Sequence, residues 1–117
     1  NPDAAIKGIQ AMNRPTLLIG GGYDKESSYD EWIQSFDGKV RYLVLIGQTK
    51  EKIKAAAERL GFTDIILCED LKEAVKVCAE KANPGDAVLL SPDCASWGQF
   101  DNYEQRGDMF KEYVKAL

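Results

Sequence analysis

Two segments of the chain combine residue types that could bind a ligand or take part in catalysis. Residues 20–27 read GGGYDKES, and residues 91–106 read SPDCASWGQFDNYEQR. Consecutive glycines let backbone N–H groups approach an anion, and Lys25 adds a cation that could meet a carboxylate. In the second segment Ser96 offers a hydroxyl next to the small residue Ala95, so a ligand could come close to the backbone there.

The glycine run has two interpretations. Its spacing matches neither GxxxxGK[ST] nor GxGxxG, the common phosphate-binding patterns. Taken alone, it more often marks a sharp exit from a strand that needs a positive φ. The alternative interpretation is a free-standing α/β module that binds a phosphate or nucleotide at the glycine loop, and the run by itself leaves that alternative open.

The amino-acid composition excludes several kinds of catalytic site. The chain contains no histidine, which excludes Ser-His-Asp triads, Cys-His pairs and histidine-containing zinc sites. Cys94 follows a predicted strand, but no histidine can activate it, which argues against a catalytic thiol. Cys68 and Cys78 fall at a strand end and on an apolar helix stripe, so we expect both in the core. There is no CxxC motif, and unpaired thiols suit a reducing cytoplasm, where we expect the protein.

Length and charge limit the partners. The 117 residues correspond to one domain, and a net charge of -4 argues against nucleic-acid binding. No apolar run approaches the roughly 18–20 residues that span a bilayer, so we expect no membrane insertion. A signal peptide is not indicated, and the first residue, Asn1, suggests a fragment or a processed chain.

Short apolar runs alternate with amphipathic segments. We predict strands at 16–19, 41–46, 65–67 and 87–90, and helices at 3–12, 29–36, 50–60, 71–82 and from 107. The strands lack in/out alternation, as in parallel sheets covered on both faces. Three helix starts carry capping residues: Ser28 with Glu31, Thr49, and Asp70 with Glu73. The predicted fold is α/β, a Rossmann-like open, mostly parallel sheet flanked by helices.

In such sheets ligands bind beyond the carboxyl ends of the strands. Both chemistry-bearing segments follow predicted strands and should therefore meet at that edge. Trp97, Phe100 and Tyr103 could stack on a ligand or simply pack the loop. Arg106 could pair with Glu104 or Asp86, in a role more structural than catalytic.

Four stretches carry a family resemblance. They are SPDCAS at 91–96 with FDNYEQRG at 100–107, GGYDK at 21–25, PGDAVLLSP at 84–92 and NPDAA at 1–5. Together they resemble the Mur ligases, and the first resembles the signature of the MurD type, which adds D-glutamate to UDP-N-acetylmuramoyl-L-alanine. The other three are similar to the family's GGxxK loop, its PGD-to-SP strand and the segment after the hinge into the last domain. The resemblance covers the whole chain.

The resemblance implies that residues 1–117 are the C-terminal domain of a three-domain enzyme of peptidoglycan synthesis. In that family the N-terminal domain holds the UDP-sugar, and the central domain carries the P-loop, Mg2+ and ATP. The C-terminal domain brings in the amino acid, whose amine attacks an acyl phosphate to give a tetrahedral intermediate and then an amide. The implied cofactors, ATP and Mg2+, belong to the full-length enzyme, and none is bound by this domain alone. The implied partners are D-glutamate, UDP-N-acetylmuramoyl-L-alanine and the two missing domains.

Carried over residue by residue, the resemblance implies three substrate-binding residues and no catalytic residue or metal ligand in this chain. Lys25 would contact the D-glutamate carboxylates, while Ser96 and Tyr103 would hold the side-chain carboxylate by hydroxyl or backbone N–H. The chain departs from the family pattern at Asp93 and Gly98, where Ala and Asp are frequent. Asp93 adds a negative charge near the expected carboxylate site.

Overall fold

The computed structural model describes residues 2–21 and 29–91, and the elements below all lie in those ranges. The helices are α1 (Pro2–Gln10), α2 (Asp30–Gln34), α3 (Lys50–Arg59) and α4 (Leu71–Lys81). The strands are β1 (Thr16–Gly21), β2 (Val40–Ile46), β3 (Ile65–Leu67) and β4 (Ala87–Leu90). All four predicted strands are confirmed, and β1 runs two residues further than predicted, into the glycine run. The helix predicted from residue 107 lies outside the described residues.

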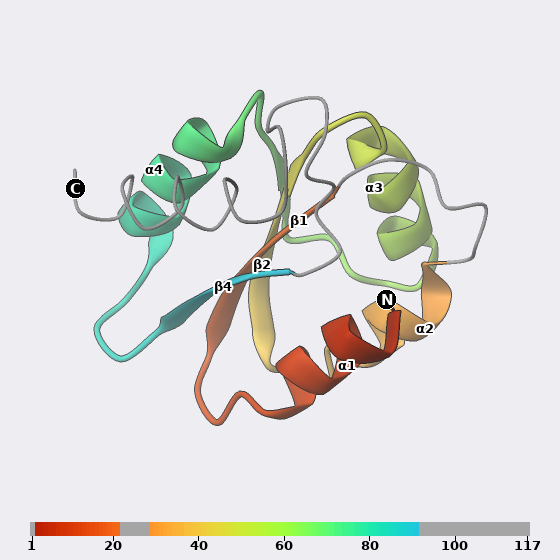
Figure 1. Cartoon of the computed structure of the whole chain (residues 1–117), viewed down its shortest axis with the longest axis horizontal. Coiled ribbons are helices and arrows are strands. Elements are labelled where there is room, and N and C mark those ends of the chain that lie inside the picture. Colours follow the sequence, from red (N-terminus) through yellow and green to blue (C-terminus); the bar gives the residue numbers. More distant parts are fainter. Residues whose placement is uncertain (1, 22–28, 92–117) are drawn as a thin grey trace.

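The four strands form one parallel sheet in the order β3-β2-β1-β4 (Figure 1). The first strand of the chain is therefore internal, between β2 and β4. Ile19 of β1 lies opposite Val44 on one side and Leu90 on the other. The predicted Rossmann-like parallel sheet is confirmed.

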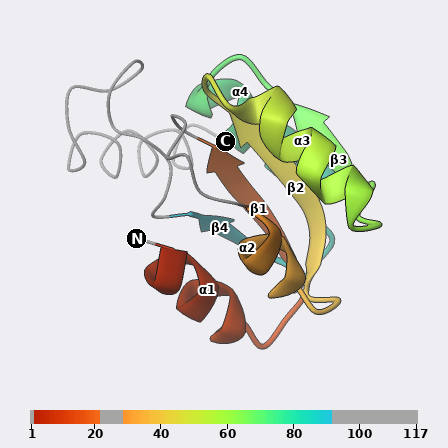
Figure 2. The same cartoon turned by 90° about the vertical axis from the view of Figure 1, so that its right-hand side faces the viewer.

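Helices cover both faces of the sheet, with α4 on one face and α1, α2 and α3 on the other (Figures 1 and 2). Successive residues of a strand point to opposite faces, so Leu17 and Ile19 pack under α4 while Leu18 packs with the other three helices. Every residue of β1 is buried. This two-sided burial explains why the strand is apolar without alternation.

The helix starts agree only partly with the predicted caps. Asp70 caps α4, because its Oδ1 accepts a hydrogen bond from the Glu73 backbone N–H over 2.8 Å. The return bond goes from the Glu69 backbone N–H to Glu73 Oε1 over 3.3 Å, one residue earlier than in a standard capping box. Thr49 occupies the N-cap of α3 but makes no side-chain capping bond.

The predicted start of α2 was wrong by one residue. Its N-cap is Tyr29, which makes no side-chain capping bond, and Ser28 lies outside the described residues. The helix ends at Gln34, two residues short of the predicted end, and Asp37 follows with a positive φ of 43°. The apolar face of the helix is nevertheless as predicted, because Trp32, Ile33 and Phe36 are all buried.

Candidate functional site

The carboxyl ends of β1 and β4 lie side by side. The backbone N–H of Ser91, the residue after β4, donates to the carbonyl oxygen of Ile19 in β1 over 2.8 Å. Ser91 is 1% exposed. The two chemistry-bearing segments of the sequence therefore leave the sheet from adjacent strands, at the edge where open α/β sheets bind ligands.

The predicted binding residues Lys25, Ser96 and Tyr103 lie outside the described residues, as do Cys94 and Arg106. Their roles stay predictions.

Close packing at the end of β1 explains why residues 20 and 21 are both glycine. Gly21 has a φ of +126°, and a Cβ there would stand 1.9 Å from the Ile46 carbonyl oxygen. A Cβ on Gly20 would stand 2.9 Å from Trp32 Cη2. The interpretation of the run as a sharp strand exit with a positive φ is confirmed at Gly21, so neither glycine needs a bound anion to explain it.

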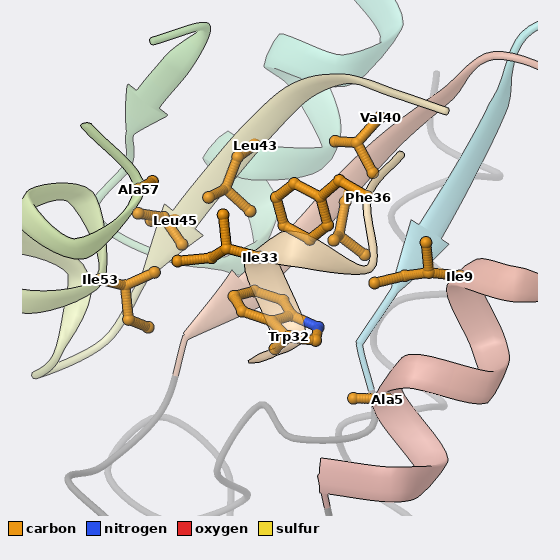
Figure 3. Packing of buried hydrophobic residues seen from close by; sticks show 11 residues of the cluster. Ala5, Ile9, Trp32, Ile33, Phe36, Val40, Leu43, Leu45, Ile53 and Ala57 are labelled. Carbon is orange, nitrogen blue, oxygen red and sulfur yellow. The ribbon is translucent and has the colours of Figure 1, made fainter. Parts of the chain in front are cut away.

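The Trp32 side chain packs beside the end of β1. Its indole is 8% exposed and meets Phe36 edge-to-face, with 5.2 Å between ring centroids. Phe36 meets Phe62 in the same way at 5.3 Å. Figure 3 shows the indole among side chains from α1, α2 and α3. Trp32 Nε1 and Tyr29 Oη are both buried with no hydrogen-bond partner within the described part of the chain.

Sequence reasoning missed Trp32 as a residue of this edge and placed it only on an apolar helix face. The sequence does contain one indication of this contact, a glycine at the end of a predicted strand followed within about a dozen residues by a large aromatic residue on a predicted helix. Such a pair is too common to interpret without coordinates, because the contact depends on how α2 crosses the sheet.

A second group of polar residues lies at the end of β3. Cys68 is buried, and burial followed by the neighbouring Glu73 carboxylate raises its pKa to about 11. Lys50 Nζ donates to the Cys68 carbonyl oxygen over 3.2 Å. Cys78 on α4 is also buried, which raises its pKa to about 12. Both thiols are therefore protonated near neutral pH, and their predicted place in the core is confirmed.

Asp86 lies at the opposite, amino-terminal edge of the sheet. Its carboxylate accepts from Arg41 Nη1 and, over 2.9 Å, from the Asn83 backbone N–H. Arg106 lies outside the described residues, so its suggested pairing with Glu104 or Asp86 stays a prediction, and within the described ranges Arg41 holds the Asp86 carboxylate. An open groove of about 350 Å³, bordered by Phe36, Val40 and Phe62, also lies toward this edge, away from the glycine run.

Across residues 2–21 and 29–91, no group of three or more Cys, Asp or Glu side chains gathers closely enough to hold a metal ion. None of the helices in those ranges has the length and apolarity that crossing a bilayer requires.

Comparison with solved structures supports the fold. A ligase domain from Haemophilus ducreyi, named for UDP-N-acetylmuramate:L-alanyl-gamma-D-glutamyl-diaminopimelate ligation, matches 99% of this chain and 83% of its own length. Its TM-score is 0.62 at 16% identity. The MurF ligase of Thermotoga maritima, solved with ADP, matches 99% of this chain over 27% of its length, with a TM-score of 0.53 at 18% identity.

Closer relatives come from the curated sequences. Proteins named UDP-N-acetylmuramoylalanine–D-glutamate ligase from Lachnoclostridium phytofermentans and Lachnospira eligens are 64% and 55% identical to this chain over 117 residues. The match covers 100% of this chain but 26% of each relative, so the chain spans about a quarter of their length. The family model described as "Mur ligase, glutamate ligase domain" matches residues 1–94. By that match the chain belongs to the Mur ligase family, and the part of the family that it represents is the glutamate ligase domain.

Proposed function

We propose that this chain is the amino-acid-binding C-terminal domain of a UDP-N-acetylmuramoylalanine–D-glutamate ligase of peptidoglycan synthesis. The names of its relatives and their high identity support this assignment. The observation that carries the proposed site is the 2.8 Å hydrogen bond from the Ser91 N–H to the Ile19 oxygen, which sets the two motif segments on adjacent strands. We propose that D-glutamate binds at this edge.

D-Glutamate is a flexible dianion, and the proposed site has matching chemistry. Lys25 supplies one cation, and the hydroxyls or backbone N–H groups of Ser96 and Tyr103 supply oriented dipoles. Charge-assisted hydrogen bonds of this kind are strong and directional. The role of the domain is to orient the D-glutamate amine for attack on an acyl phosphate, which is a contribution to proximity rather than covalent catalysis.

We assign ATP and Mg2+ to the part of the enzyme outside residues 1–117. ATP supplies the phosphoryl group that activates the acceptor carboxylate. This chain lacks a Walker A motif. We also place the enzyme in the cytoplasm, because the free thiols of Cys68 and Cys78 suit a reducing compartment.

The alternative of a free-standing phosphate-binding module has lost its main support. It rested on the glycine run, and Gly20 and Gly21 both have packing reasons to be glycine. A nucleotide titration of the chain followed by NMR separates the two readings. Shifts at Gly20–Gly22 with a nucleotide, and none at Ser96 or Tyr103 with D-glutamate, would favour the alternative.

The proposed function is tested in the full-length enzyme with Lys25→Ala and the charge-preserving Lys25→Arg. Loss of a charge-assisted bond should raise the KM for D-glutamate by about 10- to 100-fold. The KM for ATP should stay unchanged, and Lys25→Arg should retain more affinity than Lys25→Ala. An unchanged D-glutamate KM and kcat/KM in Lys25→Ala would refute the role of this lysine.

A further inference from the structure

The tight turn between α2 and β2 has two central residues with positive φ. The Lys39 backbone N–H donates to the Phe36 carbonyl oxygen over 2.7 Å. The two residues between them, Asp37 and Gly38, have φ values of 43° and 75°. Positive φ at both central positions defines a type I′ turn. These two residues also form the one Asp-Gly pair of the sequence, which contains no Asn-Gly pair.

This turn is open to water and loosely packed. Asp37 is exposed and Gly38 is half-buried, and both border the open groove of about 350 Å³ described above. A Cβ at Gly38 would meet no heavy atom within 4 Å. The peptide group between the two residues therefore has room to rotate without displacing a packed neighbour.

One rotation of that peptide group brings the Gly38 nitrogen next to the Asp37 side chain. It converts the type I′ turn into a type II′ turn, in which φ of the first central residue stays positive and its ψ is about −120°. Gly38 adopts the negative φ of the second position as readily as the positive one. In this conformation the Gly38 nitrogen eclipses Cβ of Asp37, because the substituents of a tetrahedral carbon are spaced by a third of a turn. The hydrogen bond from residue 39 to residue 36 is compatible with both turn types.

We propose that Asp37 is a site of spontaneous main-chain modification, at which a succinimide forms with Gly38 and opens to isoaspartate. The Gly38 nitrogen attacks Cγ of the protonated carboxyl group, a C–N bond forms, and the hydroxyl group leaves with the amide proton as water. Water then adds to either ring carbonyl. Cleavage of the original peptide bond gives isoaspartate, and cleavage of the new bond restores aspartate. The inference is independent of the proposed function.

Isoaspartate at this position would disturb the start of the sheet. The modified main chain runs through Cβ and Cγ, so the connection from Phe36 to Lys39 becomes one methylene group longer. The Lys39 carbonyl oxygen accepts from the Thr16 backbone N–H over 2.9 Å, at the first residue of β1. Lys39 Nζ also donates to the Gln10 carbonyl oxygen over 2.9 Å, at the end of α1. A displaced Lys39 therefore weakens contacts with both elements.

Peptide mapping of the full-length enzyme, kept folded at pH 6 and 37 °C, tests the proposal. Asp37 should accumulate a succinimide, recognised by the loss of one water, and isoaspartate, recognised by labelling with a protein isoaspartyl methyltransferase. Asp64 and Asp86 are internal controls, because the side chains of Ile65 and Ala87 shield the attacking nitrogen there. Isoaspartate at residue 37 should exceed that at either control. Equal amounts at all three residues, or none at residue 37, would overturn the inference.

Two variants identify the reacting group. Asp37→Glu keeps the negative charge but must close a six-membered ring, which forms more slowly, so modification of residue 37 should disappear. Asp37→Asn suits a type I′ turn and expels ammonia in place of water, so residue 37 should be modified faster than in the wild type. Modification of Asp37→Glu at the wild-type rate would mean that the reaction does not pass through the succinimide.

A parallel incubation in urea separates the effect of the turn from that of the local sequence. If residue 37 is modified only in urea, the fold protects it and the inference is overturned. In the folded enzyme the modified fraction should exchange the Thr16 amide hydrogen faster, because its acceptor on Lys39 is displaced. Asp37→Glu incubated in the same way should keep its Thr16 protection. Equal protection of Thr16 before and after modification would refute the effect on the sheet.

Discussion

The guanidinium of Arg41 donates to the carboxylate of Asp86 across the first residues of β1. Arg41 lies in β2 and Asp86 directly precedes β4, so the ion pair joins the two strands that flank the central one. The Asp86 side chain is 5% exposed and that of Arg41 is 31% exposed. The aspartate of the PGD stretch therefore organises the sheet edge opposite the proposed site.

Asp86→Ala should destabilise the chain by about 2 kcal/mol, because Arg41 and the Asn83 N–H both lose the carboxylate that accepts their hydrogen bonds. Asp86→Asn can still accept from Asn83 and should cost less. Urea unfolding at pH 7 measures both. Equal stability of the alanine variant and the wild type would show that the pair contributes nothing.

Gly21→Ala and Gly85→Ala form a pair that separates steric clash from backbone strain. Both glycines have a positive φ, +126° and +91°, but a Cβ at Gly85 meets nothing within 4 Å. Gly85→Ala should therefore cost only about 1 kcal/mol, the strain of the left-handed region. Gly21→Ala should cost considerably more and reduce the yield of folded protein, as circular dichroism and thermal melts would show. Similar melting temperatures for the two variants would contradict the clash with Ile46.

Removing the cap of α4 should weaken the helix locally. Asp70→Ala loses the 2.8 Å bond to the Glu73 N–H, with an expected cost of about 1 kcal/mol. Asp70→Ser retains a capping oxygen and should restore most of the stability. Amide hydrogen exchange should accelerate in the first turn of α4 in the alanine variant. Uniform protection in both variants would show that the cap is unimportant.

The two buried thiols predict a loss of stability at high pH. Burial raises the pKa of Cys78 from 9.0 to about 12 and that of Cys68 to about 11. Above pH 9 the unfolded chain loses these protons before the folded chain does, so the folded state is progressively disfavoured. The protonated thiols therefore contribute fully to folding stability below pH 9, and this contribution is lost as the pH rises toward 11 or 12.

Chemical denaturation at pH 8, 9.5 and 10.5 of the wild type and Cys78→Ala checks this expectation. The wild type should lose about 1–2 kcal/mol more than the variant over that range. Iodoacetamide at pH 8 should also modify Cys68 and Cys78 only after unfolding, as peptide mass spectrometry can establish. Rapid modification in the folded state would mean that these thiols are accessible.

The sheet was predictable because its strands are buried on both faces. Residues 16–19 and 41–46 read as continuous apolar runs, and two-sided burial by helices is the condition that produces such runs. Helix ends were less predictable. The pairing of Ser28 with Glu31 suggested a cap one residue too early, because a capping motif in the sequence does not reveal where the chain turns into the helix.

The sequence does not reveal which contacts require glycine at residues 20 and 21. Residues 20 and 21 are adjacent and identical, yet one is restricted by a side chain of α2 and the other by the backbone of β2. Likewise the sequence does not indicate Arg41 as a partner of Asp86, and the strand order brings the two residues together. Both relationships depend on contacts between residues far apart in the chain, which local patterns do not encode. Lys25, Ser96 and Tyr103 remain predictions from the family resemblance.

The placement of the first strand inside the sheet has a consequence for synthesis on the ribosome. β1 is made before either of its neighbours, and the second of them, β4, begins at Ala87, which pairs with Thr16 and lies 71 residues after it. Until then one side of this strand, which is fully buried in the folded chain, presents unpaired backbone groups. A nascent chain that has been made only as far as the turn at residues 83–86 therefore exposes this edge of β1, which is paired only when β4 follows.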